Sequence, residues 1–328
     1  MKINDILAIC GSLTMMWTAI SLISFHRTGK GSKDHLDYVL DYSDGDFRTI
    51  EIKTIHKNAI QIENELPGSP EWILSKPALN REVEGYMSRT SIQKGDKISL
   101  YYNVNPIATK KKSPEPVDVK IEVFRTGWYD GVGARKMFGP ILVPGITQQM
   151  PTPGQDGLLI CKWRDPYIIQ TYDSWTTGVY LVKMTEMNPS SMRQSYAIFV
   201  LRDDYRNSSS SSTPDIMFQL PFNTYQAYNI WGGRNLYRCN LSKGCQEARK
   251  VSFDRPFAAP ENEVGAFGTG AGEYLSNVQP IQFYPIKTTA SWNYNMVRWM
   301  ERNHLDVSYI SNSAREITLS LNKLSCLI

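Results

Sequence analysis

The sequence predicts an α+β fold of two domains: an antiparallel β-sandwich followed by an incomplete α/β domain, with an apolar helix at the N-terminus. Short apolar–polar alternations separated by turn residues run from about residue 50 to 205, which is typical of antiparallel strands. A Ser-rich segment at 207–213 ends them, and strand–helix–strand patterning follows. We therefore expect the two domains at residues 49–206 and 213–328.

The N-terminal segment, residues 1–26, contains a long apolar run. Residues 6–25 form a stretch of 20 residues without a charged side chain. As a helix, this stretch would cover about the ~30 Å hydrocarbon core of a membrane. It exceeds the apolar part of a usual signal peptide, and no small-residue cleavage motif follows it. The sequence therefore favours a membrane anchor over a cleaved signal peptide, and a buried core helix is the third alternative. Residues 27–48 are expected to be a linker.

Two sets of sequence signals disagree about which side of the membrane the rest of the chain occupies. Basic residues at 27–33 favour a cytosolic body by the positive-inside rule. Glycosylation sequons at Asn207 and Asn240 favour the opposite side, as does a disulfide between Cys239 and Cys245. Such a disulfide would close a short loop and stabilise the fold by about 2 kcal/mol. We expect the protein in a membrane or the secretory pathway, with the part of the chain after the apolar segment on the lumenal or extracellular side.

Composition excludes several other classes of protein. Hydrophobic residues make up 41% and charged residues 21% of the 328-residue chain, which argues against global disorder. The net charge is only +4, and the single basic run at 110–112 stands beside prolines, so we expect no nucleic-acid partner. Four histidines and the cysteine spacing do not fit a zinc site.

The sandwich domain is predicted from its alternating strands. The clearest of these lie at 50–53, 98–101, 117–123, 178–183 and 196–200. Turn residues separate them, including the glycine-containing stretch from 127 to 133. No long helical periodicity interrupts the strands, which favours a sandwich.

The second domain has a different pattern. Strands are predicted at 215–220 and 305–310, with an amphipathic helix at 292–303 between them. The apolar residues of this helix are Trp292, Met296, Val297, Trp299 and Met300. Ligands of open α/β sheets bind at the carboxyl ends of strands, so the aromatic segment 223–233 is the expected site. Neither a phosphate-binding loop nor the elbow of a serine hydrolase is present.

Several segments resemble the large subunit of N,N-dimethylformamidase. In the second domain they are residues 218–221, the block Tyr225-Gln226-Ala227-Tyr228-Asn229, residues 231–233, residues 251–257 and the helix around 299–301. Residues 178–181 and 195–203, and parts of 63–96, are similar to sandwich strands of the same family. The resemblance covers about residues 60–313, and the 225–229 block is its most specific part.

This resemblance implies an α/β domain similar to glutamine amidotransferases. The implied activity is hydrolysis of a small linear amide at a mononuclear iron held by two tyrosines and a glutamate. Tyr228 or Tyr225 would be one of the ligands, with Tyr228 favoured. Hard ferric iron suits phenolate and carboxylate oxygens. Its charge would drive deprotonation of a tyrosine whose free pKa is ~10.

The chain departs from the family pattern at the other ligands. Phe257 stands where a second tyrosine is expected. The glutamate of the family, in a His-x-Glu-Tyr-Trp stretch, has no counterpart, and residues 314–328 do not resemble the family. We therefore expect a C-terminally truncated member of this family that is inactive alone. Its cofactor would be iron if it is active, and otherwise we expect none.

Two other hypotheses stay open. A second chain that completes the α/β domain would supply the missing ligand and produce an active enzyme. Alternatively, the sandwich is an extracytoplasmic binding module for a ligand such as a glycan. In that case Trp128, Tyr129, Trp163 and Trp175 would contact the ligand, although core packing is the commoner role of such residues.

Overall fold

The computed structural model forms two compact units, residues 1–57 and 58–328. The residues that it describes are 35–40, 50–55, 57–105, 116–204, 214, 216–260, 263–275 and 292–312. Within these residues no helix has the length and apolarity that crossing a membrane requires. The helix predicted within residues 1–26 lies outside the described part of the chain.

The first unit contains a two-stranded antiparallel sheet. Strand β1 (His35–Leu40) pairs with β2 (Ile50–Ile55) along its whole length. Strand β1 falls inside the segment 27–48 that we expected to be a linker. The alternation at 50–53, expected in the first sandwich strand, instead belongs to β2 and pairs with β1.

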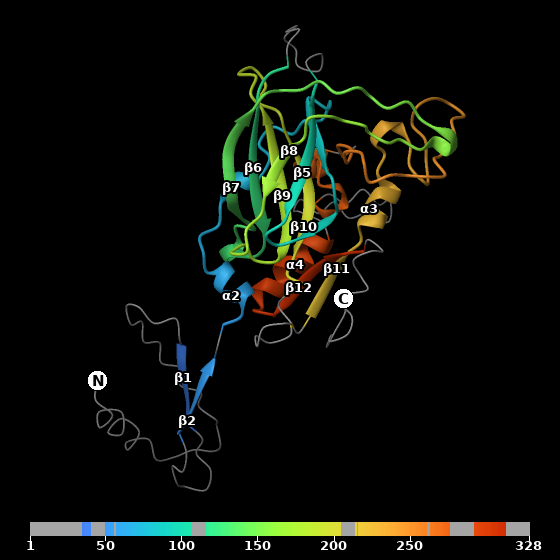
Figure 1. The fold of residues 1–328 in the computed structure, drawn as a ribbon. Helices are drawn as coiled ribbons and strands as arrows, with labels where there is room; N and C mark the ends of the chain where they lie inside the picture. The colour runs from blue at the N-terminus through green and yellow to red at the C-terminus, as the bar shows by residue number, and fades with distance from the viewer. Residues whose placement is uncertain are drawn as a thin grey trace. The chain divides into compact units, whose positions relative to one another are not determined.

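The second unit is built on two β-sheets (Figure 1). One has five strands in the order β4-β10-β9-β6-β7, and the other has three in the order β3-β5-β8. The strands are β3 (Val83–Met87), β4 (Ser91–Gln93), β5 (Lys97–Val104), β6 (Val119–Thr126), β7 (Ala134–Val143), β8 (Tyr167–Gln170), β9 (Gly178–Glu186) and β10 (Gln194–Arg202). All pairs are antiparallel except β4 with β10.

Apolar side chains from both sheets form one core between them, and they include Leu100, Val123, Val182 and Phe199. Two facing sheets with a shared core form a sandwich, so the predicted β-rich part is confirmed in outline. The parallel pairing of β4 is the departure from the purely antiparallel prediction.

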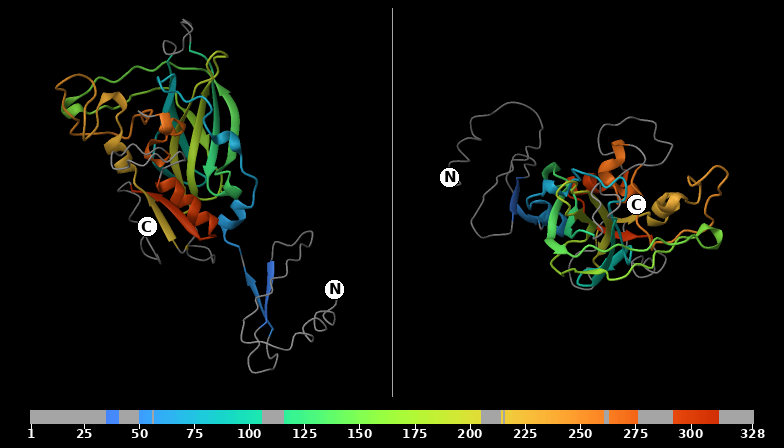
Figure 2. Two further views of the ribbon diagram at one scale, coloured as in Figure 1. Left: turned by 180° about the vertical axis from the view of Figure 1, so that it is seen from behind. Right: turned by 90° about the horizontal axis from the view of Figure 1, so that it is seen from above.

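The remaining elements are short helices and one parallel strand pair. The helices are α2 (Ala59–Asn64), η1 (Pro70–Trp72), η2 (Tyr129–Gly131), η3 (Gln155–Gly157), α3 (Phe222–Tyr228), η4 (Trp231–Gly233), η5 (Glu263–Gly268), η6 (Gly272–Tyr274) and α4 (Trp292–Arg302). Strands β11 (Ile216–Leu220) and β12 (Val307–Ser311) pair in parallel, as expected for strands joined by a crossover that contains a helix. Figure 2 shows the loops after α3 on one side of the sandwich.

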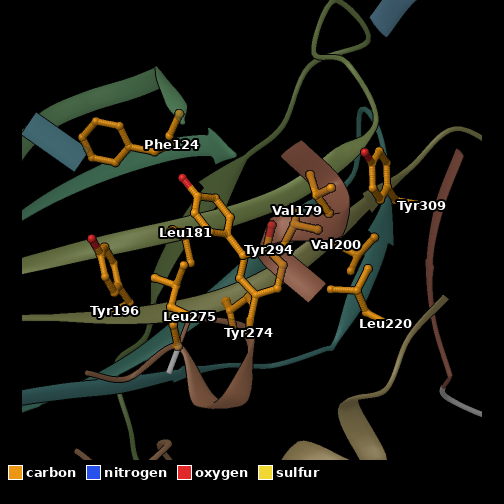
Figure 3. Close-up of a cluster of buried hydrophobic side chains, with 14 of the residues drawn as sticks. Phe124, Val179, Leu181, Tyr196, Val200, Leu220, Tyr274, Leu275, Tyr294 and Tyr309 are labelled. Carbon is orange, nitrogen blue, oxygen red and sulfur yellow. The ribbon is translucent and has the colours of Figure 1, made fainter. Parts of the chain in front are cut away.

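A second core covers the other face of the five-stranded sheet (Figure 3). Phe124, Leu181 and Ile198 of that sheet pack there with side chains of the C-terminal elements, such as Leu220 and Tyr309. Both faces of β9 are therefore covered, and all nine of its residues are buried. The two predicted domains share this core, and a domain boundary at 207–213 stays a prediction.

Helix α4 matches the predicted helix and buries part of the predicted apolar face. Tyr294, Val297 and Met300 pack into the shared core. Trp292 and Trp299, which we expected on the apolar face, remain 71% and 54% exposed. The tyrosine takes a core position because its ring fits between the rings of Trp72 and Tyr274, with centroids at 5.6 and 5.8 Å.

A buried ion pair joins α4 to the sandwich. Arg125 of β6 and Glu301 of α4 approach to 2.8 Å, and both side chains are 0% exposed. Glu301 also accepts hydrogen bonds from the Tyr309 hydroxyl and the Asn64 amide, both at 2.8 Å. Arg125 donates to the carbonyl oxygen of Thr177 at 2.9 Å. Burial lowers the pKa of Arg125, but Glu301, together with Tyr129 and Glu63, more than offsets this and holds that pKa well above its ordinary value.

The network extends to a second carboxylate. Tyr129 receives a hydrogen bond from Arg125 at 2.9 Å and donates to Glu63 at 2.8 Å. Glu63 also forms a 2.7 Å ion pair with Arg135 of β7. Burial raises the pKa of Glu63, yet the hydrogen bonds and charges of these partners hold it below its ordinary value. The negative charges of two carboxylates, on α2 and α4, are therefore neutralised by two guanidinium groups of the sheet.

Removing one charge from the buried pair should destabilise the protein strongly. We expect Glu301→Gln to lower the free energy of unfolding by about 3–5 kcal/mol, because Arg125 keeps its charge without a counter-ion. Replacing both partners, with Arg125→Met and Glu301→Leu, should recover much of this loss. Lys250→Gln is the control, because that lysine is 65% exposed and solvent screens its pair with Asp156, so its loss should change stability little. Urea denaturation measures all four proteins, and equal effects of Glu301→Gln and Lys250→Gln would contradict the prediction.

Lys183 is a buried cation of β9. Its ammonium group donates to the carbonyl oxygens of Glu71 and Ile73 at 2.7 and 2.9 Å. Burial lowers the pKa of this lysine to about 8, although the Glu122 carboxylate opposes the change. The neutral amine retains two N–H donors, so it can still serve both carbonyls.

The stability contribution of Lys183 should depend on pH. Its pKa is about 8 in the folded chain and 10.5 ordinarily, so between these values only the unfolded chain holds the proton. The contribution of Lys183 to the free energy of unfolding therefore rises with pH across this window. Burial also raises the pKa of the Cys161 thiol to about 12, which has the opposite effect.

The variant Lys183→Met separates the two contributions, because Cys161 acts equally in both proteins. We expect the free energy of unfolding of the wild type to rise relative to that of Lys183→Met as the pH increases from 8 to 10.5. Urea denaturation at a series of pH values in this range measures the difference. A difference that stays constant with pH would show that Lys183 keeps an ordinary pKa in the folded chain.

Candidate functional site

The aromatic segment expected to be the site follows the carboxyl end of β11 as helix α3. Tyr225 and Tyr228 lie about one turn apart on this helix, but their surroundings differ. Tyr225 is buried beside Phe222 and Phe257, and its hydroxyl donates to Oδ1 of Asn293 at 2.9 Å. Burial raises the pKa of Tyr225 well above its ordinary value, so its phenol is neutral at physiological pH.

Tyr228 lies nearer the surface than Tyr225. Its ring stacks on the ring of Tyr237 with a centroid distance of 4.4 Å. A hydrogen bond between these two side chains is the main cause that raises the pKa of Tyr228. Asn235 positions Tyr237 by accepting a hydrogen bond from its backbone N–H at 2.8 Å. Sequence reasoning missed Tyr237, because only the fold brings this second phenol to the first.

Glu273 of η6 is the carboxylate that acts on both tyrosines. Its negative charge contributes to the raised pKa of Tyr225 and to that of Tyr228. Helices α3 and η6 are in contact, which explains how one carboxylate influences both phenols. The fold therefore brings η6, which carries Glu273, against α3, which carries both tyrosines. Groups of three or more His, Cys, Asp or Glu side chains able to hold a metal are absent from the described residues.

Phe257 occupies the place that the resemblance assigns to a second tyrosine. Its ring meets Tyr225 edge to face at a centroid distance of 6.4 Å. It also lies against Gly272, where an added Cβ atom would come within 3.0 Å of the phenyl ring. This position does lie next to Tyr225, but it supplies no oxygen donor.

Arg255 fixes the loop that follows α3. Its buried guanidinium donates to the carbonyl oxygens of Gln226, Asn229 and Trp231 at 3.1 to 3.2 Å. Burial lowers the pKa of Arg255 to about 10. Asn229 adds hydrogen bonds to the backbone of Trp231, at 3.1 Å, and of Pro256, at 2.8 Å. One cation thus satisfies several carbonyl groups at the end of a short helix.

Trp231 attaches the same loop to the sandwich. Its indole N–H donates to Glu84 of β3 at 2.8 Å, and the Arg81 guanidinium stacks over the ring at 4.7 Å. The ring also packs with Trp163 in a small aromatic core. The loop after α3 is therefore held at both ends, by Arg255 and by the three-stranded sheet.

The other residues singled out from the sequence lie in different surroundings. Cys239 and Cys245 form a disulfide with a Cα–Cα distance of 5.8 Å. Asn240 is exposed, whereas Asn207 lies outside the described residues. Among the aromatic residues considered for glycan binding, Tyr129, Trp163 and Trp175 are buried, and Trp128 is partly buried.

Arg255 should be needed to keep the loop after α3 in place. We expect Arg255→Gln to lower the free energy of unfolding by about 2 kcal/mol, because buried carbonyl groups lose their charged donor. Hydrogen exchange should quicken at residues 226–231. Arg249→Gln is the control, because that arginine is exposed, and its effect should stay within about 0.5 kcal/mol. Unchanged exchange in Arg255→Gln would show that other contacts hold the loop.

Comparison with curated proteins found no match. Two solved structures share limited similarity with part of the chain. The cellulose-active LPMO CelS2 in complex with copper has a TM-score of 0.21 and 20% identity, covering 35% of this chain and 54% of that one. The Pseudomonas fluorescens alkylpurine DNA glycosylase AlkC, bound to DNA containing an abasic site analog, has a TM-score of 0.22 and 15% identity, covering 37% and 30%. At these TM-scores neither structure carries an argument about function.

The family comparison covers most of the second unit. Residues 120–325 match the model described as N,N-dimethylformamidase beta subunit-like, C-terminal. The matched region includes α3, η6 and α4, and it extends beyond residue 313, where we expected the resemblance to end. The chain belongs to the N,N-dimethylformamidase beta subunit-like family.

Proposed function

We propose that this chain binds ferric iron through Tyr228, Tyr225 and Glu273 and takes part in the hydrolysis of small linear amides. The observation that carries the proposal is the contact between α3, which holds both tyrosines, and η6, which holds Glu273. The effect of the Glu273 charge on the pKa of both phenols supports it. Two phenols and a carboxylate supply only oxygen donors, which fits a hard trivalent cation. Family membership supplies the reaction class, because the name of the family refers to a dimethylformamidase.

The residues around the site would prepare it for a cation. Asn293 orients the Tyr225 hydroxyl, and Tyr237 orients that of Tyr228. Arg255 and Trp231 fix the loop after α3, so that the phenols need little rearrangement. When bound, ferric iron would supply the Lewis acidity that polarises an amide carbonyl and lowers the pKa of a water molecule.

Because both tyrosines are protonated before a cation binds, binding of iron would release protons. Both have a raised pKa and hold their protons at neutral pH in the protein without a cation. A metal ligand must be deprotonated, so binding would release protons and the affinity for iron should rise with pH. The negative charge of Glu273, which opposes ionisation of the phenols alone, would favour the bound cation.

Iron binding is the direct test of this proposal. We expect the full chain to bind close to one iron per molecule and to show a tyrosinate charge-transfer absorption band. Tyr228→Phe and Glu273→Gln should each weaken binding by about tenfold or more. Tyr172→Phe is the control, because this exposed tyrosine lies outside the site. Iron content, the absorption spectrum and a melting curve are measured for each protein.

Either of two results would overturn iron binding: absence of iron from folded wild-type protein, or an unchanged spectrum in Tyr228→Phe. Hydrolysis is then assayed with small linear amides. Stoichiometric iron without amide hydrolysis would retain the metal site and remove the proposed reaction.

A further inference from the structure

Helix α4 presents exposed indole rings on the side that faces solvent. Trp292 and Trp299 are 71% and 54% exposed and lie seven residues apart, which places them on one face two turns apart. Neighbouring α2 also exposes Ile62, at 53%. Large apolar side chains grouped on a surface usually mark a contact site.

Two arginines lie beside these rings. Arg298 and Arg302 are one turn apart on α4, and both guanidinium groups stack on Trp128, at 5.2 and 4.9 Å from the ring centroid. Arg298 donates to the carbonyl oxygen of Gly131 at 3.2 Å. Within the described part of the chain, neither arginine forms an ion pair with a carboxylate. The face therefore carries two uncompensated positive charges.

The polypeptide enters the second unit next to this helix. Asn58, the first residue of the unit, caps α2, and its side-chain amide donates to the carbonyl oxygen of His304 at 3.0 Å. His304 follows α4 directly. The apolar stretch 6–25, predicted to be a membrane segment, precedes Asn58 in the sequence.

We propose that this face of α4, made of Trp292, Trp299, Arg298 and Arg302, docks onto the surface of a lipid bilayer that contains anionic lipids. Indole rings favour the boundary between hydrocarbon and water, because the ring is apolar and its N–H is polar. Arginines near a bilayer are attracted to anionic headgroups. A twofold contact between copies of this face would bring the same arginines together and is disfavoured by their repulsion.

The predicted membrane segment at 6–25 would tether the chain by itself, so the test must report on α4 locally. Full-length protein is reconstituted into vesicles of phosphatidylcholine and phosphatidylserine, and brominated lipids are used to quench tryptophan fluorescence. We expect the wild type to lose a larger fraction of its emission than the double variant Trp292→Phe, Trp299→Phe. Both residues are exposed, and equal melting temperatures would show that the variant folds normally. Equal fractional quenching of the two proteins would overturn the proposal.

A charge variant tests the headgroup contact. Arg302→Gln should reduce the bromolipid quenching assigned to Trp292 and Trp299, and so should vesicles without phosphatidylserine or a high salt concentration. Tyr172→Phe changes an exposed ring elsewhere and should leave quenching unaltered. Indifference to all three changes would overturn the role of anionic lipid. Association of the wild type into dimers that the double tryptophan variant abolishes would assign the face to a second copy instead.

Discussion

The buried pair of Arg125 and Glu301 is the interaction on which the packing of the second unit depends. Removing two charges from water is costly, so such a pair persists only where further hydrogen bonds satisfy both groups. Here the donors and acceptors come from β6, α2, β12 and the turn before β9. Each of these elements has to take the position that completes the network. A polar network thus determines how the C-terminal elements lie on the five-stranded sheet.

Helix α4 connects the features of the second unit. Near its start, Asn293 accepts the hydrogen bond of Tyr225 in the candidate iron site. Near its end, Glu301 joins the buried network. Its inner face fills the shared core, while its outer face carries Trp292 and Trp299. The site, the core and the exposed face therefore rest on one rigid helix, and a change to its packing affects all three.

Local patterns in the sequence were enough to identify most strands, including β11 and β12, and the helix α4 between them. Alternation identified β5, β6, β9 and β10, and the family motif located Tyr225 and Tyr228. The exposed face of α4 could not be foreseen, because periodicity groups Trp292 with the apolar residues and gives no weight to Tyr294. Glu273 and Tyr237 were missed because they meet the tyrosines only through tertiary folding. The network of Arg125 was equally hidden, since charged residues are normally expected at the surface.

The separation of Arg125 and Glu301 by 176 residues along the chain has a consequence for synthesis of the protein. The ribosome completes β6 long before α4, and at about 5–20 residues per second this interval lasts about 10–35 seconds. Throughout it the Arg125 guanidinium lacks the Glu301 carboxylate, and after β10 is complete one face of the five-stranded sheet still lacks the side chains of α4. The emerging sandwich is therefore incompletely covered, and its apolar face is prone to non-native association until translation reaches α4.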